Sequence, residues 1–369
     1  MDPLALDRWH MARALALAER GRGAVEPNPL VGCIIARGAE LLGEGWHRRY
    51  GGPHAEIEAL ALARERARGA TLYVTLEPCC HHGKTPPCTD ALLKAGVRRV
   101  VVAMRDPFPA VDGGGFAQLA AAGVEVVAGV LEAEAAALNA PYLTLLTAGR
   151  PWVVAKWAMT LDGKIATTRG DSRWISHEQS RAIAHALRGR VDAIVVGRGT
   201  VERDDPLLTA RPEGPRRAVR VVMDSQARIS PASQLVRTAR EWPVLVAVGP
   251  AAPSERRVAL RNEGCEVFVC AGENHSERLR SLLVEMGRRR WTNVLIEGGG
   301  TLLGAAFDER LIDELHVFVA PKISGGAGAP SPIGGLGAAL MSDATLLNDV
   351  TWRDIAGDLY LTGRLRREG

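Results

Sequence analysis

The sequence predicts a protein of two α/β domains. At 369 residues the chain exceeds the usual size of one domain, and its content of 47% hydrophobic and 24% charged residues is that of a globular protein. Helical and strand-like patterns alternate through the first half, as in an α/β/α layered sandwich. The run AGRP at residues 148–151 then interrupts the pattern. We therefore expect one domain over residues 1–148 and a second over residues 149–369.

Hydrophobic periodicity places the elements of the first half. In chain order they are a helix over 4–20, a hairpin of strands over 30–36 and 39–46, a helix over 55–68, a strand over 71–77, a helix over 89–95, a strand over 97–104, a helix over 116–122, a strand over 124–131 and a closing helix over 131–146. Such alternation predicts a sheet that helices cover on both faces.

The second half shows the same alternation. Strands are predicted over 151–159, 192–197, 218–224, 243–249, 265–271, 293–297 and 313–320, with helices over 176–189, 254–264, 276–287 and 301–311 between them. The second domain is therefore also α/β.

Composition and charge narrow the function classes. No apolar run reaches the roughly 18 residues of a membrane span, and the start of the chain lacks the form of a signal peptide, so we expect a cytoplasmic protein with no membrane partner. The net charge of +4 permits nucleic-acid binding without requiring it. Six cysteines in so long a chain do not make a disulfide scaffold, and three of them fall within ten residues, which favours metal binding or catalysis.

A histidine and two cysteines have the composition of a catalytic zinc site. Such a site uses three protein ligands and keeps one position open for water, and His54, Cys79 and Cys88 supply an imidazole and two thiolates. Glu56, two residues after the histidine, could move protons for the bound hydroxide. The pattern H-x-E followed by P-C and a further cysteine is the signature of zinc deaminases.

The two cysteines are separated by eight residues, a polar and basic insertion over 80–87. A purely structural zinc site is the alternative, with a fourth ligand from Cys80, His81 or His82. That site would have no use for Glu56.

Three segments resemble the deaminase half of a known family. HAE at 54–56, EPCCHHGKTPPCTDAL at 77–92 and PNPLVGCII at 27–35 are similar to the bifunctional riboflavin-biosynthesis deaminase/reductases, in which a long insertion between the cysteines is typical. The resemblance covers essentially the whole chain. It implies a cytidine-deaminase-like fold for the first domain and a diaminopyrimidinone ribotide as substrate, which loses ammonia from C2.

The resemblance also implies substrate contacts in the deaminase domain. They are Asn28, His47, His81, Lys84 and Asp106, with the lysine suited to the phosphate. The sequence departs from the family at DPFP, residues 106–109, where DPNP is more common. Phe108 cannot replace the hydrogen bonds of an asparagine.

Four stretches of the second half end strands with polar or glycine-rich turns. They are AKWAMTLDGKIAT (155–167), VVGRGTVERDDPLLTAR (195–211), VVMDS (221–225) and VLIEGGGTLLGAAF (294–307). Ligands of open sheets bind beyond strand ends, and a glycine turn into a helix presents N–H groups to an anion. Because no stretch matches G-x-G-x-x-G with its following acidic residue, the glycines alone do not establish a dinucleotide site.

Together the four stretches resemble the reductase half of the same family, which implies a dihydrofolate-reductase-like fold, NADPH as cofactor and reduction of the ribosyl group to a ribityl chain. The implied cofactor contacts are Ala158, Trp174, Thr200, Asp204, Gly299, Gly300, Thr301, Leu302, Leu303, Gly304 and Ala305. The implied substrate contacts are Ser172, Arg188, Leu208, Arg211 and Glu297, of which the two arginines suit a phosphate. We hypothesise that hydride reaches C1′ of the ring-opened ribose while Lys156 assists the proton balance.

The sequence therefore predicts a cytoplasmic enzyme that binds Zn²⁺ and NADPH, acts on a phosphorylated pyrimidine riboside, binds no nucleic acid and forms a homo-oligomer. A nucleic-acid or nucleoside deaminase with an accessory domain is one alternative, but aromatic residues total only 5%, and the second domain would go unexplained. A zinc-stabilised binding module is another, and it predicts that Glu56→Gln leaves function untouched. In a third, only one half is active.

Overall fold

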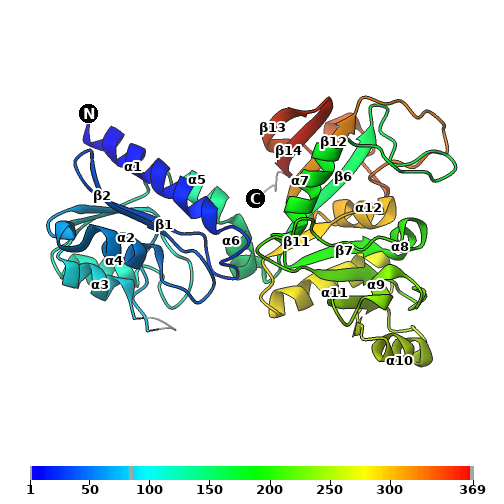
Figure 1. Cartoon of the computed structure of the whole chain (residues 1–369), viewed down its shortest axis with the longest axis horizontal. Helices are drawn as coiled ribbons and strands as arrows, with labels where there is room; N and C mark the ends of the chain where they lie inside the picture. The colour runs from blue at the N-terminus through cyan, green and yellow to red at the C-terminus, as the bar shows by residue number, and fades with distance from the viewer. Residues whose placement is uncertain (1, 83–85, 366–369) are drawn as a thin grey trace. The chain divides into compact units, whose positions relative to one another are not determined.

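The computed structural model describes residues 2–82 and 86–365 of the chain. The chain divides into two compact units, Met1–Ala148 and Gly149–Gly369, and each is described by itself (Figure 1). Both are α/β, which confirms the predicted fold class.

The first unit is built on one mixed sheet in the order β2-β1-β3-β4-β5. Its strands are β1 (Gly32–Arg37), β2 (Glu40–Trp46), β3 (Thr71–Leu76), β4 (Arg99–Met104) and β5 (Glu125–Ala128). Strands β3, β4 and β5 are parallel, whereas β1 is antiparallel to both β2 and β3. The carboxyl ends of β2, β3 and β4 therefore meet the amino end of β1 at one edge of the sheet.

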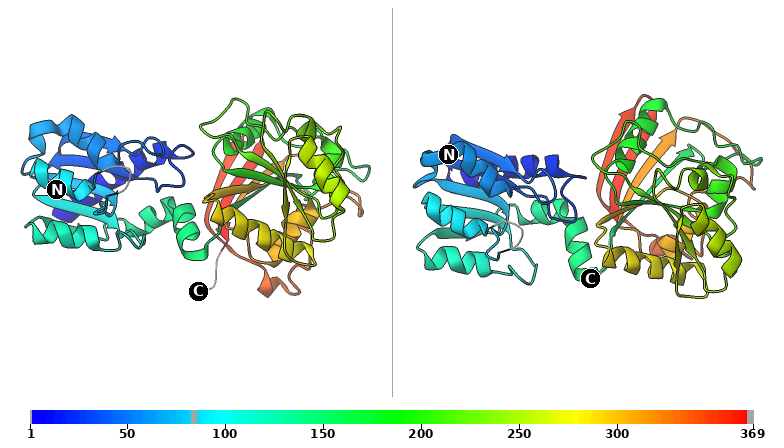
Figure 2. Two further views of the ribbon diagram at one scale, coloured as in Figure 1. Left: turned by 90° about the horizontal axis from the view of Figure 1, so that it is seen from below. Right: turned by 60° about the horizontal axis from the view of Figure 1, so that its bottom comes forward.

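Helices cover both faces of this sheet (Figure 2). They are α1 (Pro3–Ala18), η1 (Glu19–Gly21), α2 (Ala55–Ala63), η2 (Arg64–Ala67), α3 (Cys88–Ala95), α4 (Gly114–Ala121), α5 (Glu132–Leu138) and α6 (Ala140–Ala148). Helices α1 and α5 share an apolar core with one face, and α2, α3 and α4 with the other. The closing helix predicted as continuous breaks at Asn139, whose buried amide exchanges two hydrogen bonds with the backbone of Leu30 (2.8 and 3.0 Å).

The second unit contains a nine-stranded sheet in the order β10-β9-β8-β7-β11-β6-β12-β14-β13. The strands are β6 (Trp152–Thr160), β7 (Ala193–Gly197), β8 (Val219–Met223), β9 (Val244–Val248), β10 (Glu266–Val269), β11 (Asn293–Ile296), β12 (Glu314–Ala320), β13 (Leu347–Ile355) and β14 (Asp358–Leu365). From β10 to β12 all neighbours are parallel, so these seven strands end at one edge of the sheet. Strand β14 is antiparallel to both of its neighbours, β12 and β13.

Helices also cover both faces of the second sheet (Figure 2). They are α7 (Glu178–Arg188), α8 (Arg198–Asp204), α9 (Gln234–Arg237), α10 (Ser254–Asn262), α11 (His275–Arg288) and α12 (Gly300–Asp308), with the short η3 (Met341–Asp343). Helices α7, α9 and α10 pack against one face of the sheet, where they contribute Leu187, Leu235 and Leu260 to an apolar core. Helices α11 and α12 contribute Leu282 and Leu303 to the core on the other face.

Besides the short η3, four elements of the second unit were not predicted. Helices α8 and α9 are only 7 and 4 residues long, too short for a clear helical period. Strand β13 lies at the edge of the sheet with nearly all of its residues exposed, so it lacks the alternation of a half-buried strand, and β14 pairs with it.

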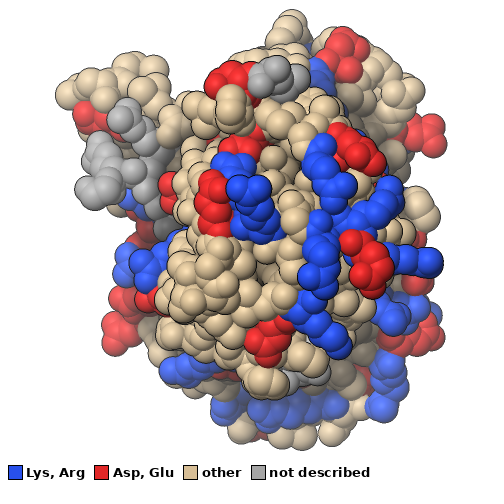
Figure 3. Space-filling model, turned by 90° about the vertical axis from the view of Figure 1, so that its left-hand side faces the viewer, with Lys and Arg blue, Asp and Glu red and all other residues tan. Residues whose placement is uncertain are grey.

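Surface charge and helix hydrophobicity are the features that bear on nucleic-acid and membrane partners. Figure 3 shows one face of the molecule, on which lysine and arginine side chains stand among acidic ones. No helix among the described residues is long and apolar enough to cross a membrane.

Candidate active sites

The three predicted zinc ligands lie together at the edge where the strands of the first unit end. His54 precedes α2, Cys79 follows β3, and Cys88 begins α3. One ligand atom from each falls within 4.8 Å of the others. The sequence folds this way because each ligand sits at a junction between a loop and a regular element, and the sheet order brings the junctions to one edge.

The spacing of the ligand atoms fits a zinc ion. The Nδ1 atom of His54 lies 3.2 Å from the sulfur of Cys88 and 3.5 Å from that of Cys79. Tetrahedral zinc, with bonds of about 2.0 Å to nitrogen and 2.3 Å to sulfur, would separate a nitrogen and a sulfur ligand by about 3.5 Å. The side chain and backbone N–H of Cys88 and the ring of His54 lower the pKa of Cys79 to about 4, so the thiolate is the favoured form.

Glu56 lies beside these ligands in the first turn of α2. Its side chain is 3% exposed, and burial raises its pKa. A carboxyl group whose pKa is shifted towards neutrality can both accept and return a proton. No fourth protein ligand joins the three within the described part of the chain.

Two predicted substrate contacts form a hydrogen-bonded pair next to the ligands. The ring of His47 meets that of His54 edge-on at 5.5 Å. Because its Nδ1 faces the carbonyl of Pro53 at 2.9 Å and must donate, the neutral imidazole accepts at Nε2 from the Asn28 amide at 3.2 Å. Burial lowers the pKa of His47, which favours that neutral ring.

Asp106 is held at the same edge by a hydroxyl and a backbone N–H. The Tyr142 hydroxyl donates to its carboxylate at 2.9 Å, and the Phe108 N–H donates at 3.0 Å. Burial raises the pKa of Asp106. No local sequence pattern pointed to Tyr142, which lies 36 residues further along the chain.

In the segment DPFP, residues 106–109, the aromatic ring of Phe108 stands where the resemblance led us to expect the amide of an asparagine. The ring of Phe108 lies 5.9 Å from that of His81. The Nδ1 atom of His81 is buried and has no hydrogen-bond partner among the described residues. Lys84, the predicted phosphate contact, lies outside the described residues.

In the second unit, a buried carboxylate joins two predicted side chains. Glu297, just after β11, accepts from Lys156 Nζ at 3.1 Å and from two nitrogens of Arg188 at 2.5 and 2.8 Å. Burial alone would raise the pKa of Glu297, but Arg188 and Lys156 together lower it to about 2. A third nitrogen of Arg188 donates to the Thr209 carbonyl at 3.3 Å. The guanidinium is thus committed to protein partners, whereas exposed Arg211 donates to no other described residue.

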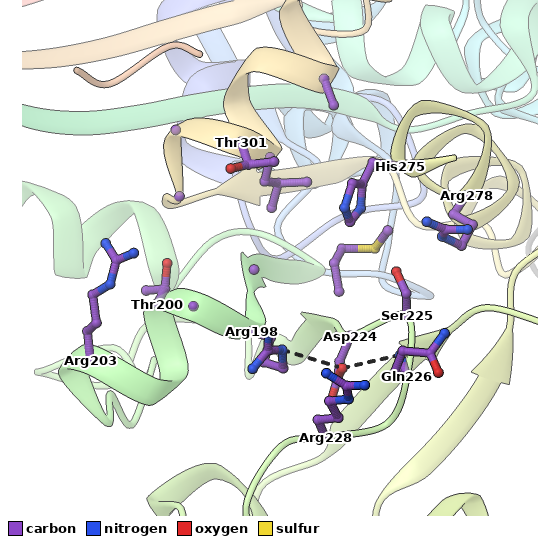
Figure 4. A pocket seen from close by; sticks show the side chains of 17 residues that line it. Arg198, Thr200, Arg203, Asp224, Ser225, Gln226, Arg228, His275, Arg278 and Thr301 are labelled. Carbon is purple, nitrogen blue, oxygen red and sulfur yellow. Dashed lines mark hydrogen bonds and ion pairs between the residues drawn. The ribbon is translucent and has the colours of Figure 1, made fainter. Parts of the chain in front are cut away.

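A pocket of about 500 Å³ opens at the carboxyl ends of β7, β8 and β11 (Figure 4). It lies within the usual volume range of ligand sites. Six predicted cofactor contacts line it: Thr200, Gly299, Gly300, Thr301, Leu302 and Ala305. Gly298 and Gly299 have φ angles of 134° and 84°, which side chains disfavour, and the turn leads into the N-terminus of α12, where N–H groups can face a diphosphate.

The other predicted residues lie around or behind this pocket. Leu303 is buried in the core, and a Cβ at Gly304 would meet Gly334, so neither lines it. Ala158 shares a face of β6 with Lys156. The hydroxyl of Ser172 donates to the carboxylate of Asp204 at 3.4 Å. Trp174 is 63% exposed, and the guanidinium of Arg181 stacks over its ring. Leu208 is buried.

The pocket also contains residues that the sequence did not single out. They include Arg198, Arg203, Gln226, Arg228, His275 and Arg278. Arg228 follows the VVMDS strand end closely enough to have been suspected. His275 and Arg278 come from α11 and have no local signal.

Comparisons with known proteins agree with the two centres. Residues 5–104 match the cytidine and deoxycytidylate deaminase zinc-binding region, and residues 151–361 match the RibD C-terminal domain. The chain is 42% identical to the riboflavin biosynthesis protein RibD of Actinobacillus pleuropneumoniae, covering 96% of this chain and 94% of that one. It is 39% identical to the Escherichia coli RibD, covering 86% and 89%.

Solved structures give the same likeness. Acinetobacter baumannii RibD superposes with a TM-score of 0.86 at 36% identity, covering 99% of this chain and all of that one. A diaminohydroxyphosphoribosylaminopyrimidine deaminase/5-amino-6-(5-phosphoribosylamino)uracil reductase from Thermotoga maritima superposes with a TM-score of 0.84 at 35% identity, covering 98% and 99%.

Proposed function

Because the chain belongs to the RibD family of riboflavin-biosynthesis enzymes, we propose a division of its described residues between two reactions. The protein is a bifunctional deaminase and reductase that uses zinc and NADPH and acts on a phosphorylated pyrimidine. Hydrolytic deamination of the diaminopyrimidinone ribotide precedes reduction of its ribosyl group. The observation that carries the residue assignment is the grouping of His54, Cys79 and Cys88 around one point, with Glu56 beside it.

In the deaminase centre, His54, Cys79 and Cys88 hold the metal. Zinc bound by these three residues would supply the Lewis acidity that activates water. Glu56 would accept a proton from the attacking water and return it to the departing nitrogen, so that oxygen replaces the amine at C2 and ammonia leaves. Asn28 and His47 bind the ring edge, and their mutual hydrogen bond fixes their orientation.

In the reductase centre, the residues near Glu297 bind the substrate and supply a proton to it. NADPH, when bound by this unit, would supply the hydride for C1′ of the ring-opened ribose. Lys156 supplies, directly or through water, the proton that completes the reduction. Glu297 orients Lys156 and Arg188 by its hydrogen bonds to both. Arg211 is the cation left available for the substrate phosphate.

A single assay tests the assignment. The purified protein would receive the diaminopyrimidinone ribotide, with ammonia release and NADPH oxidation followed together, before and after treatment with a zinc chelator. Glu56→Gln should stop ammonia release while zinc is retained, and Lys156→Ala should stop NADPH oxidation while ammonia is released. Lys94→Ala, at an exposed lysine of α3, is the matched control for the loss of a positive charge. Unchanged NADPH oxidation by Lys156→Ala would reject the role of that lysine.

We also propose that a second copy of the chain covers the edge strand β13. Trp352 in that strand is 59% exposed, and Leu340 and Met341, which precede the strand in the chain, are 65% and 89% exposed. An edge strand with a large exposed apolar side chain favours pairing with another chain. Sedimentation should show a dimer that Trp352→Glu weakens, and a monomeric wild type would reject the proposal. The cytoplasmic location and the absence of a nucleic-acid partner stay predictions.

A further inference from the structure

We propose that Arg220 is a positioning residue of the reductase reaction, which holds residues 205–211 in the conformation that binds the substrate. These residues form an irregular segment after α8, here named the substrate segment, and they include two predicted substrate contacts, Leu208 and Arg211. The proposal rests on the proposed function, because it takes Arg211 to bind the substrate phosphate. It gives a role to a buried charge that no sequence motif indicated.

Arg220 is a completely buried cation without an acidic partner. It lies in β8 with none of its surface exposed, and among the described residues it meets no carboxylate within the distance of an ion pair. Burial lowers its pKa to about 10, so the guanidinium stays charged at neutral pH. Because burying an unpaired charge costs free energy of folding, the reason for this side chain must lie in the hydrogen bonds that it makes.

Those hydrogen bonds join β8 to three other parts of the chain. One terminal nitrogen of Arg220 donates to the Leu207 carbonyl at 3.3 Å and to the Thr238 hydroxyl at 2.8 Å. The other donates to the carbonyls of Thr238 at 3.1 Å and Trp242 at 2.5 Å. Leu207 belongs to the substrate segment, whereas Thr238 follows α9 and Trp242 precedes β9. A guanidinium suits this task because its donors are fixed in one plane and bonds from a charged donor are strong.

The substrate segment needs such support because its backbone is strained. Asp205 and Leu208 have φ angles of 38° and 54°, in the left-handed region that residues with a Cβ disfavour. Conformations of this kind persist only where the surrounding structure holds them. Leu208 is buried in the apolar core, and Gln234 at the start of α9 donates to Asp205 from its backbone and its side chain at 2.8 and 2.5 Å. Arg220 adds an anchor between them, at Leu207.

The carbonyl of Thr209 connects the substrate segment to the reductase centre. It accepts from Arg188 at 3.3 Å, and Arg188 also donates to Glu297. Guanidinium groups therefore hold two alternate carbonyls of the segment, one through Arg220 and one through Arg188. Without Arg220 the first of these anchors is lost, and the direction in which the segment presents Arg211 to the substrate is no longer fixed.

Steady-state kinetics of the full-length protein test the proposal. NADPH oxidation would be followed with the deaminated ribotide, 5-amino-6-(5-phosphoribosylamino)uracil, as substrate. Arg220→Met removes the donors and keeps an unbranched side chain. We expect it to raise the Michaelis constant for the deaminated ribotide at least about tenfold, as the loss of bonds from a charged donor predicts. The Michaelis constant for NADPH and the rate of ammonia release should stay within about twofold.

A double variant separates positioning from general packing. If Arg220 acts through Arg211, adding Arg220→Met to Arg211→Ala should raise the ribotide constant by less than about twofold further, because the contact that Arg220 positions is already absent. A merely structural role predicts effects that multiply, together with a rise in both Michaelis constants. Should Arg220→Met fail to fold, Thr238→Val removes one acceptor of Arg220 with little change of shape. It should raise the ribotide constant about threefold and show the same lack of additivity with Arg211→Ala.

The matched control is Arg237→Met, the same change at an exposed arginine of α9, which should leave both Michaelis constants in place. An unchanged ribotide constant in Arg220→Met would overturn the proposal, and so would effects that multiply in the double variant. In either case, a raised ribotide constant in Arg211→Ala would leave the proposed function standing. An unchanged constant in Arg211→Ala would instead reject the phosphate-binding role of Arg211, and with it the premise of the proposal.

Discussion

Glutamine in place of Glu77 should loosen the deaminase loops without removing a metal ligand. The side chain is buried between β3 and the first ligand cysteine. One carboxylate oxygen accepts from the N–H groups of Gly115 and Phe116 at 2.9 and 3.2 Å. The other accepts from those of Gly113 and Asp106 at 3.0 and 3.3 Å. One carboxylate thus fixes both the start of α4 and the segment that carries Asp106.

The size of the effect follows from these four bonds. Glutamine keeps one acceptor oxygen and turns an NH₂ group towards two N–H donors, so two charge-assisted hydrogen bonds are lost. Each is worth about 1.5–3 kcal/mol. We therefore expect the free energy of unfolding of the first unit to fall by about 3 kcal/mol or more. The Michaelis constant for the ribotide should also rise, because Asp106 loses its backbone anchor.

The two activities provide separate probes of the two units. Ammonia release and NADPH oxidation would be measured after equilibration in increasing urea. At a typical denaturant dependence, Glu77→Gln should lower the midpoint for ammonia release by about 1 M or more and leave that for NADPH oxidation in place. Glu65→Gln, the same change at an exposed position, is the control. If the two variants shift the ammonia midpoint equally, the anchoring role of Glu77 is refuted.

Two further predictions concern the reductase unit. The pKa of Glu297 falls from its ordinary 4.5 to about 2 through Arg188 and Lys156, so its stabilising contribution is present above pH 4.5 and lost as the pH falls towards 2. Acid titration of the thermal midpoint should show this loss in the wild type and a shallower one in Glu297→Gln; parallel curves would contradict it. A Cβ at Gly304 would lie 2.4 Å from the Gly334 backbone, so Gly304→Ala should abolish NADPH oxidation and spare ammonia release. Gly328→Ala, with open space around its Cβ position, should leave both activities intact, and equal effects of the two substitutions would argue against the packing explanation.

Local sequence patterns were sufficient to predict the fold class, the metal ligands and the glycine turn. The alternation of helix and strand predicted the α/β class because burial of one helix face or a whole strand leaves a period in the residues themselves. His54, Cys79 and Cys88 were predictable as metal ligands because zinc requires particular side-chain types, and those are rare enough for their grouping to be informative. The glycine turn before α12 was visible for a similar reason, since few other residues adopt its backbone.

The tertiary structure decided which distant residues act together. Arg278 reaches the same pocket as Arg228 because the parallel strands β8 and β10 end at the same edge of the sheet, and α11, which carries Arg278, begins shortly after β10. Tyr142 meets Asp106 across 36 residues in the same manner. Arg188 was expected to face a phosphate, and the fold also directs two of its nitrogens to Glu297. Sequence spacing carries no record of such contacts, because they depend on strand order and on which face of the sheet each connection crosses.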